Sequence, residues 1–183
     1  LHVPRGAIND HTVVKALQDN AVEGIAVFGC GILHENVFRA CHGKVVNIHQ
    51  GLSPYYRGSG TNFWPFVNGE LECVGVTVHY IDHGIDTGGI ICHGRPDIRD
   101  SDSLHLIGCK TIEVSANLLS RVFLSMDHGH VPASIPQWSK GRYYRRKDFN
   151  ADAVISAQRK IAQGLVTNYV QNRNRCIQLI NWT

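Results

Sequence analysis

The sequence lacks the features that mark membrane and secreted proteins. No apolar run approaches the roughly 18 residues that span a bilayer, and the first residues do not follow the basic, apolar and small-residue order of a signal peptide. The formal net charge is only +3 over 183 residues, so composition does not indicate a nucleic-acid-binding protein. These absences predict a soluble, cytoplasmic protein with no membrane partner.

Motifs of several enzyme classes are also missing. The six cysteines form no C-x-x-C pair, and we expect reduced, mostly buried thiols rather than disulfides. No G-x-S-x-G elbow surrounds Ser53, and no cysteine has a clear histidine partner in sequence, which disfavours a serine or cysteine nucleophile. The glycines match neither a Walker loop nor a G-x-G-x-x-G fingerprint, so a nicotinamide enzyme is not indicated.

Histidine, in contrast, is abundant, with eleven residues. The tightest cluster with carboxylates is His79, Asp82, His83 and Asp86, and histidines four apart would share one face of a helix and could bind zinc. The segment TVHYI alternates as a strand does, however, and strand geometry does not bring His79 and His83 together with Asp82 as ligands. We therefore expect no metal.

Apolar periodicity predicts an alternation of strands and helices. Strands are expected at 24–29, 45–49, 75–82 and 88–98, and helices at 11–20, 35–41, 60–68, 102–125 and 151–166, the last ended by Gly164. The long fourth helix carries a stripe of period 3.6, formed by Leu104, Ile107, Thr111, Val114, Leu118, Val122 and Met126. Ser101 or Asp102 can cap its first turn. Residues 138–146 have the pattern of a hairpin arm. This order predicts one α/β domain with a sheet that is at least partly parallel.

Two polar side chains lie within the expected strand at 45–49. Residues two apart in a strand point the same way, so Asn47 and His49 project together while Val46 and Ile48 point to the opposite face. Open α/β sheets bind ligands beyond the carboxyl ends of their strands, where a paired amide and imidazole would suit an electrophile. The alternative is that both are hydrogen-bonded polar residues at a strand end.

A second polar block, IDHGIDTGG at residues 81–89, follows a strand and contains three glycines that allow close approach to a ligand. Asp86 could lie beside His49 and keep the imidazole protonated, since a nearby negative charge favours imidazolium. Amide, imidazolium and carboxylate together suit acyl transfer, because donors stabilise an oxyanion while the carboxylate handles protons. The alternative for Asp86 is a turn aspartate bonded to its own backbone.

Two ordered segments resemble motifs of the folate-dependent formyltransferases, which include glycinamide ribonucleotide, methionyl-tRNA and amino-sugar N-formyltransferases. NIHQGLSPYYRG, residues 47–58, is similar to N-x-H-x-S-L-L-P-x-Y-x-G, and GVTVHYIDHGIDTGGII, residues 75–91, is similar to G-V-T-V-H-x-x-D-x-G-x-D-x-G-x-I. The resemblance extends over residues 10–125. Gly51 and Ser53 stand where the family usually has Ser and Leu, so the loop after the histidine is expected to differ in shape.

The resemblance implies a Rossmann-like, mostly parallel sheet flanked by helices, and transfer of a formyl group from 10-formyltetrahydrofolate to a primary amine. It implies that Asn47 and protonated His49 stabilise the oxyanion, while Asp86 supports His49 and proton transfer. No metal is implied. The implied folate-binding residues are Phe28, Gly29, Cys30, Ile32 and Leu33 on one wall and Ile81 and Asp82 on the other.

The resemblance also bears on the organisation of the chain. Family members carry several βα units before the strand matching 24–29, so these first units are expected to be missing, unless another subunit of a homo-oligomer completes the sheet. We expect residues 1–127 to form the formyltransferase-like α/β domain, and residues 128–183 to form a connector, a basic hairpin and a terminal helix packed on it. No segment after residue 150 is long enough for a tRNA-binding domain. The segment GRYYRRKDFN, residues 141–150, and the helix after it resemble the tails of sugar-type or unassigned relatives, which favours a small amine acceptor, such as one linked to a nucleotide.

Three functions stay open at this stage. Formyl transfer to a small amine leads, a 10-formyltetrahydrofolate hydrolase would use water in place of the amine, and a silent module would bind folate without turnover. The basic segment RYYRR, residues 142–146, is either an ordinary solvated hairpin or a phosphate clamp.

Overall fold

A mixed four-stranded sheet forms the centre of the fold in the computed structural model, which describes residues 1–41, 44–126, 130–172 and 177–182. The strand order is β1 (Gly24–Val27), β2 (Lys44–His49), β4 (Val76–Tyr80) and β5 (Ile90–Gly94). β1 and β2 are parallel, and β4 runs antiparallel to both of its neighbours. Three of the four strands therefore point in one direction, and the predicted α/β class is confirmed.

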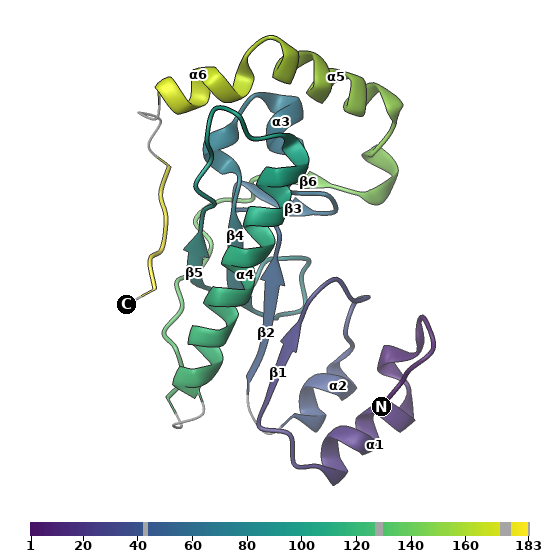
Figure 1. The fold of residues 1–183 in the computed structure, drawn as a ribbon. Helices are drawn as coiled ribbons and strands as arrows, with labels where there is room; N and C mark the ends of the chain where they lie inside the picture. The colour runs from purple at the N-terminus through teal and green to yellow at the C-terminus, as the bar shows by residue number, and fades with distance from the viewer. Residues whose placement is uncertain (42–43, 127–129, 173–176, 183) are drawn as a thin grey trace.

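Helices flank this sheet at its face and at both ends (Figure 1). The helices are α1 (His11–Asp19), α2 (Glu35–Ala40), α3 (Trp64–Asn68), α4 (Leu104–Met126), α5 (Ala151–Ala162) and α6 (Leu165–Gln171), with short 3-10 turns η1 (Ala7–Asn9), η2 (Leu71–Cys73) and η3 (Arg146–Asp148). α4 crosses one face of β4 and β5, α1 and α2 lie beside β1, and α5 packs on α3 at the opposite end. None of the helices in the described ranges is both long and apolar enough to cross a bilayer.

The main core lies between the sheet and α4. Val46 and Ile48 of β2 pack there with Leu118 and Val122, and all four are buried. The predicted stripe on α4 was Leu104, Ile107, Thr111, Val114, Leu118, Val122 and Met126, of which Ile107, Thr111, Leu118 and Val122 are buried. Because β2 points its even-numbered residues at this core, Asn47 and His49 are left on the other face, as the alternation predicts.

The amino-terminal cap of α4 differs from the prediction. Ser103 Oγ accepts the backbone N–H of Leu106 at 3.1 Å, so Ser103 caps the first turn rather than Ser101 or Asp102. Asp102 instead stabilises the turn before α4, since its carboxylate accepts a hydrogen bond from the backbone N–H of Arg99 at 2.8 Å.

The predicted hairpin at 138–146 is wrong. β6 (Arg142–Tyr144) pairs in parallel with a distant short strand, β3 (Tyr56–Gly58), which the sequence pattern did not reveal. Aromatic packing explains why β6 pairs with β3. The Tyr144 ring stacks on Trp64 with centroids 4.1 Å apart and on Tyr56 with centroids 6.0 Å apart.

Two predicted helices have different bounds. The segment at 60–68 becomes helical only from Trp64, and the helix at 151–166 divides at Gly164, whose φ of 85° lies in the left-handed region. Ala157 and Val166, on the two resulting helices, pack with Phe66 in a second core. The proposed domain boundary at residues 127 and 128 lies outside the described residues.

Candidate active site

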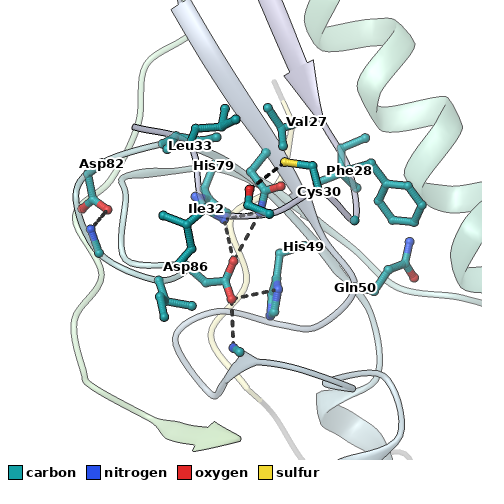
Figure 2. A pocket seen from close by; sticks show the side chains of 18 of the residues that line it. Val27, Phe28, Cys30, Ile32, Leu33, His49, Gln50, His79, Asp82 and Asp86 are labelled. Carbon is teal, nitrogen blue, oxygen red and sulfur yellow. Dashed lines mark hydrogen bonds and ion pairs between the residues drawn. The ribbon is translucent and has the colours of Figure 1, made fainter. Parts of the chain in front are cut away.

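A cavity of about 950 Å³ opens beside the carboxyl ends of β1 and β2. Its lining comes from the loop after β1, the end of β2, residues 58–63 and the loop at 81–86. Figure 2 shows His49 and Asp86 facing each other at its floor, with the loop after β1 across from them. This is the edge of the sheet at which the sequence predicts a site.

The structure brings the three predicted catalytic residues together. Asn47 Nδ2 donates to Asp86 Oδ1 at 3.3 Å, and His49 Nδ1 lies 3.4 Å from Asp86 Oδ2. His49 is 5% exposed and the Asp86 side chain 13%, so both are largely removed from water. The cluster therefore joins an amide, an imidazole and a carboxylate in a site of low polarity, where each charge acts strongly on the others.

The Asp86 carboxylate points into the site and not at its own turn. Its backbone φ of 51° is left-handed, a conformation that is uncommon outside glycine and frequent at functional sites. Gly58 N–H donates to its Oδ2 at 2.8 Å. The local turn bonds that were the alternative for Asp86 are made by Asp82, which accepts from Gly84 N–H and Thr87 Oγ1 at 3.0 and 2.6 Å.

The hydrogen bonds of His49 fix the position of its proton. Nε2 lies 2.9 Å from the carbonyl oxygen of Tyr56, which can only accept, so Nε2 carries hydrogen and Nδ1 is the titrating nitrogen. Burial lowers the pKa of His49 below its ordinary value, and the negative charge of Asp86 offsets only part of that effect. The prediction that Asp86 keeps His49 protonated is therefore wrong for the free site.

Asp86 remains ionised despite its surroundings. Burial raises the pKa of its carboxyl, but the facing imidazoles of His79 and His49 and the Gly58 N–H together outweigh burial, so the pKa lies below its usual range. A carboxylate held in this state is available as a proton acceptor at neutral pH.

His79 also belongs to this cluster, although the sequence pattern indicated no role for it other than that of a metal ligand. Its Nδ1 donates to the Tyr80 carbonyl oxygen at 2.7 Å, so in the neutral ring Nε2 accepts the hydrogen bond from Asn47 Nδ2 at 3.1 Å. This contact orients the Asn47 amide. Asn47 and His79 are register partners across the β2–β4 ladder, a signal that exists only once the pairing of the strands is known.

All seven predicted folate-binding residues line the cavity. On the wall after β1, Phe28 and Ile32 are 59% and 70% exposed, so these large apolar side chains are accessible to a ligand. Within the described residues, no three His, Cys, Asp or Glu side chains are grouped to hold a metal ion. The cavity thus offers a polar floor and an apolar, accessible wall.

Comparison with known proteins relates this chain to a family of enzymes. A family model described as "Formyl transferase" matches residues 4–123. The methionyl-tRNA formyltransferase of Desulforamulus reducens is 38% identical over 92 residues, which are 50% of this chain and 28% of that protein. The phosphoribosylglycinamide formyltransferase of Bacillus subtilis is 33% identical over 99 residues, 54% of this chain and 50% of that protein.

Solved structures agree on the fold. The formyltransferase PseJ from Anoxybacillus kamchatkensis, in complex with UDP-4,6-dideoxy-4-formamido-L-AltNAc and tetrahydrofolate, has a TM-score of 0.61 at 25% identity and covers 81% of this chain and 71% of its own. A sugar N-formyltransferase from a Shewanella species has a TM-score of 0.67 at 20% identity, covering 84% and 65%. The predicted Rossmann-like class is confirmed by these neighbours. The chain spans 28% to 50% of the length of the two curated relatives.

Proposed function

Because the chain belongs to the formyl transferase family, we propose that it transfers a formyl group from 10-formyltetrahydrofolate to the primary amine of a small acceptor, at Asn47, His49 and Asp86. The observation that carries this proposal is the meeting of these three side chains on the floor of one cavity with an exposed apolar wall. The wall, including Phe28 and Ile32, suits the flat ring of a folate.

The chemistry begins with attack of the amine nitrogen on the formyl carbon. The carbonyl electrons move to oxygen, and collapse of the resulting oxyanion breaks the bond between the formyl carbon and the folate nitrogen. The amine loses a proton and the folate nitrogen gains one, so the reaction is balanced. Asp86, ionised and beside the reacting centre, accepts the proton from the amine and passes it on.

Asn47 and His49 act on the oxyanion. The Asn47 bond to Asp86, at 3.3 Å, is longer than its bond to His79, at 3.1 Å, so the N–H facing Asp86 is the donor most easily given to the oxyanion. The developing negative charge raises the pKa of His49 and offsets the effect of burial. His49 is therefore neutral in the free site. As the oxyanion forms, Asp86 passes the proton of the amine to Nδ1 of His49, and this proton reaches the folate nitrogen when the oxyanion collapses.

For the acceptor, we propose an amino sugar linked to a nucleotide. Two structurally similar proteins carry such compounds, PseJ with a UDP-linked formamido sugar and an N-formyltransferase from Helicobacter canadensis with dTDP-3-aminofucose. The curated relatives include methionyl-tRNA and phosphoribosylglycinamide formyltransferases. Methionyl-tRNA and glycinamide ribonucleotide are therefore the alternative acceptors to test.

The experiment is incubation of the purified protein with 10-formyltetrahydrofolate and one acceptor at a time. We expect tetrahydrofolate release with dTDP-3-aminofucose and little with glycinamide ribonucleotide, methionyl-tRNA or no amine. Release at the same rate without any amine would establish hydrolysis instead of transfer. Binding of the donor without release under every condition would establish a silent folate-binding module.

Cys30 provides an independent test of the folate wall. Its thiol is exposed and lines the cavity, whereas the other described cysteines are buried or, for Cys109 on α4, half-buried. Burial raises the pKa of the Cys30 thiol above its ordinary value and raises those of Cys73 and Cys92 to about 12, so labelling is best measured at mildly alkaline pH.

We expect folinic acid to slow iodoacetamide labelling of Cys30 about tenfold or more, because a ring held on the wall excludes the reagent. Mass spectrometry of the digested protein measures each site separately. Cys109, which lies outside the cavity, serves as the internal control and should be labelled equally with and without folinic acid. Equal labelling of Cys30 in both samples would remove it from the folate site.

A further inference from the structure

The basic segment at 142–146 is divided between the two faces of the β3–β6 ladder. Tyr144 stacks on Trp64, and Arg142 forms an ion pair with Glu70 and donates to the Tyr56 hydroxyl at 2.9 Å. These two members of the segment are therefore committed to packing and cannot also bind a ligand.

The opposite face carries Arg57, Tyr143 and Arg145. Arg57 and Tyr143 are register partners in a parallel ladder, so their side chains point to the same side. Arg145 has extended backbone and returns to that side, where its guanidinium lies 5.8 Å from the centre of the Tyr143 ring. Tyr143 is 43% exposed. Arg57 Nε donates to the Lys140 carbonyl oxygen at 2.8 Å, and within the described ranges no ion pair joins Arg57 or Arg145 to a carboxylate.

This face adjoins the reacting centre through Gly58. A Cβ at Gly58 would lie 2.9 Å from Tyr143 Cε2, so the ring edge rests against this glycine. The same residue lines the cavity and donates its N–H to Asp86. The positive charge of Arg57 adds to burial in lowering the pKa of His49, so its field reaches the site.

We propose that Arg57, Tyr143 and Arg145 bind the nucleoside diphosphate part of the acceptor, whose amino sugar enters the cavity past Gly58. This rests on the proposed function and adds the residues that would select such an acceptor. A guanidinium presents a fork of donors that matches phosphate oxygens, and Arg57 and Arg145 share their face of the ladder with the exposed ring of Tyr143, on which a base can stack. Three residues suffice for a diphosphate and a single base, and they form no extended basic track for RNA.

Binding of dTDP alone tests the inference without any formyl transfer. By isothermal titration calorimetry we expect the protein to bind dTDP more tightly than pyrophosphate or thymidine, because charge and ring act together. Arg145→Ala and Tyr143→Leu should each weaken dTDP binding at least tenfold. Arg146→Ala is the matched control, since Arg146 is the exposed neighbouring cation in η3, and its affinity should stay within twofold of the unsubstituted protein.

The kinetic counterpart uses dTDP-3-aminofucose. The KM for this acceptor should rise at least tenfold in Arg145→Ala, while the KM for 10-formyltetrahydrofolate stays unchanged, a split that general damage to the fold would not produce. Equal dTDP affinity of Arg145→Ala and Arg146→Ala would overturn the inference. So would formyl transfer to a small amine by a protein that does not bind dTDP at millimolar concentration, a result that would leave the proposed function standing.

Discussion

Replacing Asp86 by asparagine is expected to lower kcat by about 10³-fold or more, in line with the loss of a positioned proton acceptor. The substitution keeps the size of the side chain, and asparagine tolerates the left-handed φ of 51° at this position. It removes the negative charge that faces His49 Nδ1 at 3.4 Å and the carboxylate that takes the proton of the amine. The loss should therefore appear in kcat and not in folding.

Tetrahydrofolate release measures the rate, and thermal unfolding checks the fold. Asp100→Asn is the control, because Asp100 is an exposed carboxylate in the turn before α4 and its substitution changes net charge equally. His49→Ala should be similarly inactive, and the double variant should be no slower than either single one, because the two residues act as a unit. A near-normal rate in Asp86→Asn would disprove its assignment.

Strand alternation is the part of the site that the sequence predicts well. With a side-chain period of two, Asn47 and His49 must share a face once β2 is a strand, and the buried Val46 and Ile48 decide which face is the core. The glycines around Asp86 likewise indicate a loop that can approach another element. The local pattern thus indicates Asn47, His49 and Asp86 as candidate site residues before any long-range contact is known.

The misses at the site and in strand pairing depend on long-range packing. His79 reaches Asn47 through the register of β2 and β4, which no local pattern specifies. The pairing of β3 with β6 joins three-residue strands 86 positions apart, too short to show periodicity. The proton on His49 is decided by how completely it is buried, so a charge argument based on Asp86 alone gave the wrong direction.

His93 extends the same lesson to stability. It is 6% exposed, and its Nε2 donates to the Ser53 carbonyl oxygen at 2.8 Å while its Nδ1 accepts the Ile180 N–H at 2.9 Å. Both ring nitrogens are used by a neutral imidazole, and a second proton on Nδ1 would break the bond to Ile180. Burial lowers the pKa of His93 from 6.5 to about 4.

The sign of the pH dependence follows from which state binds the proton. Between pH 6.5 and about 4 the unfolded chain protonates this imidazole and the folded chain does not, so the stability present above pH 6.5 is lost as pH falls through this window. We expect the free energy of unfolding to fall by up to about 3 kcal/mol from this residue alone between pH 7 and pH 4.

Urea unfolding of the unsubstituted protein and of His93→Gln, measured at half-unit steps from pH 7 to pH 4, isolates the effect. Glutamine retains a donor and an acceptor but does not titrate, and other groups, His49 among them, contribute equally to both curves. The difference between the two free energies should therefore shrink as pH falls and level off near pH 4. Parallel curves across the whole range would mean that His93 has the same pKa in the folded and the unfolded chain, and would contradict the effect of its burial.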